Sequence, residues 1–165
     1  MRVVVNSTPI IALSLVNRLS ILKKLFGEVI IPKSVFDELV VAGKGKVGSK
    51  EVENANWLTV LQPQSKEVIP PFLLGLDKGE LDVIILAKEI EADLVLIDEK
   101  AGRRVAKAMG LKLKGTLGVI LMACRENYIT KDEAESIISQ LDQSFIRISP
   151  RLIKWFKNEL RRIEE

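Results

Sequence analysis

Four oxygen-bearing side chains stand at or soon after the ends of apolar runs in this sequence: Asn6, Glu38, Glu80 and Asp98. Asn6 and Asp98 directly follow short β-branched or aliphatic runs, whereas the two glutamates lie on amphipathic stretches typical of helices. Carboxylate and amide oxygens are the ligands that hard cations such as Mg²⁺ and Mn²⁺ prefer. The residue types therefore indicate a candidate site for a divalent cation.

Electrostatics supports this interpretation. Carboxylates gathered at one place repel one another and raise each other's pKa. A bound divalent cation offsets that repulsion.

The sequence has no histidine and a single cysteine, Cys124. Imidazole metal sites, histidine-dependent nucleophilic catalysis and Cys/His zinc sites are therefore excluded, and so is an internal disulfide.

Each acidic residue also has an ordinary structural explanation. Glu80 can be half of a helix capping box, because it stands three residues after an aspartate. Glu38 can be a solvated helix carboxylate, and Asp98 can cap a turn after a strand. We expect Asp82 and Glu99 to be solvated. The candidate site therefore depends on the joint placement of the four side chains.

The elements that must position these residues alternate along the chain. We expect strands at 2–5, 28–31, 57–61, 93–97 and 111–114, and a short edge strand at 145–148. We expect helices at 8–26 (one helix or a pair), 32–41, 49–56, 77–91, 101–109, 116–127, 130–143 and 150–165, with a loop at 62–76. This order predicts βαβ units and a three-layer α/β/α fold with a central parallel sheet of four to five strands.

Two threonines are expected to begin helices. Thr8, followed by Pro9, has the sequence of an N-cap, and Thr116 is expected to cap the helix that runs to about residue 127. In an open parallel sheet, sites lie beyond the carboxyl ends of strands where the strand order reverses. If the first and fourth strands are neighbours, Asn6 and Asp98 would face each other there.

Length and composition are those of an ordinary globular chain. The 165 residues are 47% hydrophobic and 28% charged, which fits one domain over 1–165. No stretch approaches the roughly 20 apolar residues of a membrane span. The opening residues read as a strand and not as a signal peptide, so we expect no membrane association and a cytoplasmic location.

Basic residues offer a candidate surface for a polyanion. The net charge of +3 permits such a partner without requiring one. Arg103, Arg104 and Lys107 lie on one predicted helix and are candidate RNA-binding residues. Lys112, Lys114 and the loop at 44–50 could extend this surface. The ordinary alternative is a solvated basic face, and aromatic residues for base stacking are few.

The last predicted helix, 150–165, has a strong apolar stripe. The stripe contains Leu152, Ile153, Trp155, Phe156, Leu160 and Ile163. Such stripes usually pack on a domain core, although this one could also form a contact between two copies.

Five segments together resemble the PIN-domain family, in particular the prokaryotic proteins related to VapC-type toxins. They are VVVNSTPIIAL at 3–13, VIIPKSVFDEL at 29–39, GLDKGE at 75–80, ADLVLIDEKAGRRVA at 92–106 and GTLG at 115–118. The resemblance spans roughly residues 2–145. It implies the PIN fold and metal-dependent cleavage of RNA phosphodiesters, with Mg²⁺ or Mn²⁺ activating water and stabilising the charge that develops at phosphorus.

Carried over by position, the resemblance places metal ligands at Asn6, Glu38, Glu80 and Asp98. The three acidic residues among them are the candidate catalytic residues. Ser7 and Thr116 would support the site by hydrogen bonding. The departure is Asn6, where the family usually has Asp. Asparagine can offer a carbonyl oxygen but no charge, so metal affinity and activity should be weaker.

Several functional interpretations stay open. The first is a ribonuclease, as the toxin of a toxin–antitoxin pair that binds an antitoxin protein and forms a homodimer. The second is a non-catalytic PIN-like module that binds RNA or protein, which the uncharged Asn6 favours. A receiver-type or flavodoxin-like module is disfavoured, because no Asp doublet follows the first strand.

Overall fold

The fold was analysed in a computed structural model, which describes residues 1–65 and 75–164. Most of the predicted loop at 62–76 lies outside these residues. Five parallel strands form one sheet in the order β3-β2-β1-β4-β5. Their bounds are β1 Arg2–Val5, β2 Glu28–Pro32, β3 Leu58–Leu61, β4 Leu94–Leu96 and β5 Leu113–Lys114. The predicted parallel sheet is confirmed.

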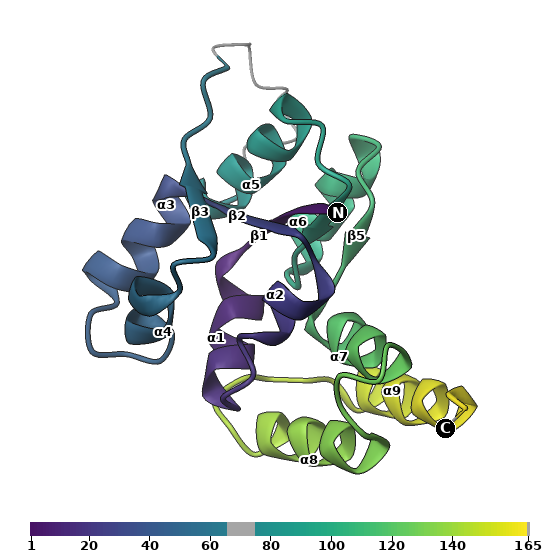
Figure 1. Ribbon diagram of the computed structural model, residues 1–165. Coiled ribbons are helices and arrows are strands. Elements are labelled where there is room, and N and C mark those ends of the chain that lie inside the picture. The colour runs from purple at the N-terminus through teal and green to yellow at the C-terminus, as the bar shows by residue number, and fades with distance from the viewer. Residues whose placement is uncertain (66–74, 165) are drawn as a thin grey trace.

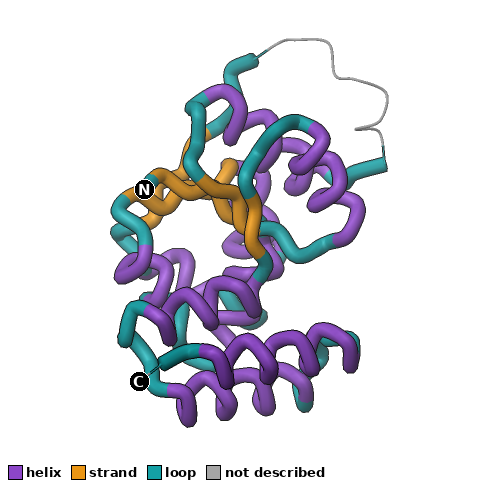
Figure 2. Tube along the Cα trace, turned by 90° about the vertical axis from the view of Figure 1, so that its right-hand side faces the viewer, coloured by secondary structure: helices purple, strands orange, loops and turns teal. Residues whose placement is uncertain are grey.

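Helices lie on both sides of the sheet, which gives the predicted three-layer α/β/α fold (Figures 1 and 2). Their bounds are α1 Ser7–Leu15, α2 Ile21–Leu25, α3 Lys33–Phe36, η1 Asp37–Ala42 (a π-helix), α4 Ser49–Asn54, α5 Lys78–Glu89, α6 Lys100–Ala108, α7 Thr116–Arg125, α8 Lys131–Asp142 and α9 Pro150–Arg162. Among the described residues, none of these helices is long and apolar enough to cross a membrane.

The core begins at the centre of the sheet. Val3, Val4 and Val5 are completely buried, because helices cover both faces of β1. Helices α8 and α9 pack outside α7 (Figure 1). Helix α9 contributes Phe156 to the main core, whereas Trp155 on the next face of the helix is 44% exposed.

Several local predictions were wrong. The N-cap of α1 is Asn6 and not Thr8, because the helix begins directly after β1. Helix α7 is preceded by Gly115, so Thr116 is its first residue. Residues 145–148 form no strand: Ile146 and Ile148 pack against the core from an irregular segment. Their alternating pattern therefore reports burial and not strand pairing.

Candidate functional site

The carboxyl ends of β1 and β4 meet at the point where the strand order reverses. The two strands are hydrogen-bonded neighbours, and the backbone N–H of Asn6 donates to the carbonyl of Leu96 at 2.9 Å. The condition stated for convergence, that the first and fourth strands are neighbours, is therefore met. The polar residues that follow these strands lie at the start of helices α1 and α6.

Glu99, and not Asp98, lies against Asn6. The Asn6 side-chain N–H donates to Glu99 Oε2 at 3.0 Å, and the Thr8 hydroxyl donates to Glu99 Oε1. Asn6 is only 2% exposed. Glu99 is the N-cap of α6, yet its side chain caps nothing on its own helix. Its carboxylate is held instead by two residues at the end of β1 and the start of α1.

Asp98 turns toward the start of α7. Its Oδ1 accepts from the Thr116 backbone N–H at 2.8 Å, and its Oδ2 accepts from the Thr116 hydroxyl at 2.6 Å. Burial raises the pKa of the Asp98 carboxyl, and the Thr116 hydrogen bonds and the Arg103 charge partly oppose that rise. The Thr116 side chain therefore supports this carboxylate directly.

Glu80 forms the predicted capping box, and one of its two carboxylate oxygens takes no part in it. Its backbone N–H donates to Asp77 Oδ1 at 2.8 Å, and its Oε1 accepts from the Asp77 backbone N–H at 3.3 Å. The residue is 8% exposed, and Oε2 is buried with no hydrogen-bond partner in the described part of the chain. Burial, followed by the hydrogen bond to Asp77, raises the pKa of Glu80 to about 7; the Glu99 charge adds to this.

Two glycines leave room for these carboxylates. A Cβ at Gly102 would stand 2.9 Å from Glu80 Oε2, and a Cβ at Gly115 would stand 2.7 Å from Asp98 Oδ1. Both separations are shorter than a real side chain allows. Gly102 thus brings the first turn of α6 against the unpartnered Glu80 oxygen, close to Glu99.

Glu38 and Ser7 are less closely tied to the site. Glu38 is exposed on the π-helix η1, and its Oε1 lies 3.6 Å from the position of a Cβ at Gly79 on the first turn of α5. It therefore stands beside the helix start that carries Glu80. Ser7 is half-buried, and its hydroxyl makes no hydrogen bond to a described residue.

The donor chemistry fits a hard divalent cation, since the residues offer only oxygens. The buried, unpartnered Glu80 Oε2 also fits, because such an atom lacks the compensation that burial normally requires. Within 1–65 and 75–164, however, no three acidic side chains lie close enough together to hold a metal. The carboxylates of Asp98 and Glu99 point to different partners, Thr116 for the first and Asn6 with Thr8 for the second, so side-chain rotation would be needed to gather them.

Glu99 and Thr8 were missed as site residues by the sequence interpretation. The available signal was the acidic doublet Asp98-Glu99 directly after a buried strand. In the structure the two carboxylates of this doublet point to different elements, Asp98 to the start of α7 and Glu99 to the end of β1.

The predicted RNA-binding residues on α6 differ in their exposure and in their contacts. Arg103 is half-buried and donates from Nη1 to the carbonyl of Ile97 at 2.9 Å. It therefore fixes the end of β4 beside Asp98. Arg104 and Lys107 are exposed on the same helix.

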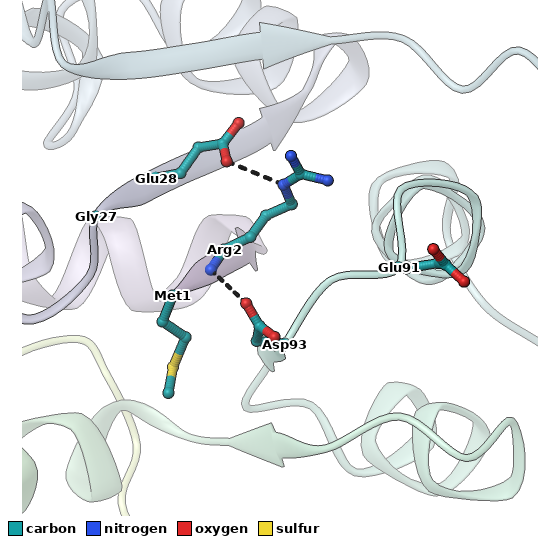
Figure 3. A pocket seen from close by; sticks show the side chains of 6 residues that line it. All are labelled: Met1, Arg2, Gly27, Glu28, Glu91 and Asp93. Atoms are coloured by element: carbon teal, nitrogen blue, oxygen red, sulfur yellow. Dashed lines mark hydrogen bonds and ion pairs between the residues drawn. The ribbon is translucent and has the colours of Figure 1, made fainter.

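A separate open pocket of about 350 Å³ lies at the opposite end of β1 (Figure 3). Arg2 engages two of its acidic side chains: the Arg2 backbone N–H donates to Asp93 at 2.7 Å, and the Arg2 guanidinium binds Glu28 at 2.9 Å. Arg2 begins β1 whereas Asn6 follows its end. The pocket is therefore not part of the carboxylate site.

Comparison with known proteins gives one positive result. No curated protein matches the chain. A family model that describes a PIN domain matches residues 2–162, which is nearly the whole length. The match agrees with the parallel sheet, with the polar Asn6 after β1 and with the acidic Asp98 and Glu99 after β4. The chain belongs to the PIN-domain family, whose members are in general nuclease-type modules.

Proposed function

We propose that this protein is a ribonuclease that depends on Mg²⁺ or Mn²⁺, with Glu80, Asp98 and Glu99 as its inner carboxylates. Glu38 contributes from the rim. Asn6 occupies the position of the missing carboxylate and holds Glu99 there by its 3.0 Å hydrogen bond. The substrate is a phosphodiester of RNA, and the place of action is the cytoplasm.

The observation that carries this proposal is the buried Oε2 of Glu80. A carboxylate oxygen without a partner is costly in a protein interior, and burial raises the pKa of this group to about 7. A nearby cation would offset that cost and keep the group ionised. The capping box explains the other oxygen of Glu80 but not this one.

The protein's own groups have separate parts in the reaction. The bound cation would supply activation of water and stabilisation of charge on the phosphate. Thr116 holds Asp98 in one orientation through two hydrogen bonds. Asn6 and Thr8 do the same for Glu99. Glu80, kept ionised by the cation, would offer its buried Oε2 as a ligand, while the capping box fixes its other oxygen.

The test is incubation of the pure protein with structured RNA and Mn²⁺, alongside Glu80→Gln and Asp98→Asn. Both variants should lose at least about tenfold in rate, which corresponds to about 1.4 kcal/mol of transition-state stabilisation. Asp82→Asn is the matched control, since Asp82 lies on α5 but makes none of the site's contacts. Undiminished cleavage by both site variants would show that this is not the active centre.

A second candidate is a non-catalytic PIN module that binds RNA or protein. Asn6 favours it, because the end of β1 has no charge, and so do the neutral donors that already engage Asp98 and Glu99. Absence of cleavage by the parent and by Asn6→Asp, with RNA binding retained, would support this alternative.

The toxin role, the antitoxin partner and the homodimer stay predictions of the family resemblance. Coexpression with the protein encoded next to this chain, followed by measurement of complex mass and of RNA cleavage, would test the first two.

A further inference from the structure

A cavity of about 130 Å³ opens directly on the carboxylate site. Its polar end is formed by Thr8, Asp98 and Thr116. The remaining wall is mostly apolar and comes from α1, α7, α8, the segment 146–148 and the start of α9. A small, largely apolar recess with hydroxyls at one end has the character of a subsite for a planar heterocyclic ring.

A second, more open cavity of about 490 Å³ continues along α9. Ile148 lines both cavities, so they adjoin. The walls of the second cavity carry Lys154, Lys157 and Arg161, with Asp142 as the acidic member. Positions three and four apart share one helix face, so these three cations form a single stripe beside the cavity.

The charges of this stripe are available to a ligand. Lys154 and Lys157 are exposed and form no ion pair with any described residue. The same is true of Arg147, which lines the smaller cavity. Arg161 donates only to the neutral side chain of Asn158. By contrast, Arg103 on α6 is committed to the carbonyl of Ile97.

We propose that single-stranded RNA leaves the carboxylate site over Ile148 and follows the basic stripe of α9. The base next to the cleaved phosphate occupies the 130 Å³ cavity, and the following phosphates contact Lys154, Lys157 and Arg161. This inference rests on the proposed function, since it takes Asp98 as the start of the path. An acidic protein segment would also suit the stripe, but not a ring-sized recess with hydroxyls beside the carboxylates.

The experiment measures binding of a fluorescent single-stranded RNA in EDTA, where cleavage is suppressed, over a series of salt concentrations. In Lys154→Gln/Lys157→Gln, affinity should fall about tenfold at low salt, and the slope of log affinity against log salt should drop by about 1.4, or 0.7 per phosphate contact. Lys23→Gln/Lys24→Gln on α2 is the matched control, and Arg104→Gln/Lys107→Gln on α6 tests the competing surface. All of these side chains are exposed, so folding should not change.

The base subsite is tested with RNAs that carry one abasic position each. The parent protein should bind RNA more weakly when the abasic site stands at one particular position of the RNA, the position whose base would occupy the cavity. Leu152→Ala enlarges the cavity and should reduce that loss at least about threefold, or about 0.7 kcal/mol. Trp155→Ala, on the same helix but outside the cavity walls, should leave the loss unchanged.

The outcomes separate this inference from the proposed function. RNA binding that depends on α9, without cleavage under any metal, supports the path and contradicts the nuclease. Cleavage with RNA affinity unaffected by the α9 changes contradicts the path alone. An effect of the α6 pair instead, or binding of polyglutamate but not of RNA, also overturns the path.

Discussion

The side chain of Asn6 donates a hydrogen bond of 3.0 Å to Glu99, which lies 93 residues later in the chain. This bond joins the end of β1 to the turn after β4. An aspartate at position 6 would place two carboxylates at that separation. Asn6 and Glu99 therefore form a neutral–acidic pair at a place where two acidic residues would need a cation between them.

We predict that Asn6→Asp is destabilising without metal and is rescued by it. In EDTA the variant loses a hydrogen bond to a charged acceptor and gains repulsion, so the free energy of unfolding should fall by about 2–3 kcal/mol. Mn²⁺ should then raise its melting temperature more than that of the parent. Thermal unfolding with and without Mn²⁺ measures both effects.

The double variant Asn6→Asp/Glu99→Gln is the control, because it exchanges the two chemical types. An amide at 99 can donate to a carboxylate at 6, so stability in EDTA should recover most of the loss. Equal destabilisation in the single and double variants would show that the two side chains are not coupled.

Glu80 should make stability depend on pH. The pKa of the folded protein's Glu80 is about 7, above the ordinary value of 4.5, so the folded state holds the proton more tightly than the unfolded state. The stabilisation that the folded state gains from binding this proton is fully present below pH 4.5 and is lost as the pH rises to about 7. The loss is at most about 3 kcal/mol.

Glu80→Gln cannot ionise, so in EDTA its unfolding free energy should exceed that of the parent at pH 8 and converge with it near pH 4.5. Urea denaturation across this range is the measurement, with Asp82→Asn as the matched control on α5. Parallel pH profiles for the parent and Glu80→Gln would contradict the buried, unpartnered state of this carboxyl.

The sheet, and the approach of the residues that follow β1 and β4, were predictable from the sequence. Apolar runs without in–out alternation indicate strands covered on both faces, and Val3–Val5 are indeed fully buried. A parallel order then places strand ends at one edge, which brings Asn6 near the residues after β4.

The partners within the site were not predictable. Asp98 and Glu99 are adjacent in the sequence, and only the three-dimensional positions of α1 and α7 decide which of them meets Asn6 and which meets Thr116. The segment 145–148 was wrongly predicted to be a strand for a similar reason. Alternating apolar residues show which side is buried but do not identify a strand to pair with.

Thr116→Val should lower the free energy of unfolding more at neutral pH than at acid pH. The change removes the 2.6 Å hydroxyl bond to Asp98 and keeps the β-branched shape. Since this bond opposes the rise that burial causes, the pKa of Asp98 should rise further. The expected loss at pH 8 is about 1.5–3 kcal/mol, the usual worth of a hydrogen bond to a charged group, and it should shrink as Asp98 becomes protonated.

Carboxyl-carbon NMR titration of Asp98 and urea denaturation at pH 8 and pH 4 measure these two effects. Thr116→Ser keeps the hydroxyl and should retain most of the parent's Asp98 titration. If Thr116→Val and Thr116→Ser shift the titration of Asp98 equally, the hydroxyl hydrogen bond does not act on this carboxylate.

Gly115→Ala should displace Asp98, because the new Cβ would meet its Oδ1 at 2.7 Å and the Arg103 guanidinium at 3.2 Å. Relief requires both side chains to move, at a cost of about 1–3 kcal/mol in stability and with a loss of any metal-dependent RNA cleavage. Gly118→Ala, in the first turn of α7 that Gly115 precedes, would make only ordinary contacts at 3.6 Å or more from Lys114. It should be neutral or stabilise the helix by up to about 1 kcal/mol. Urea denaturation and cleavage assays of the two variants compare them; equal behaviour would mean that the close approach at Gly115 does not position Asp98.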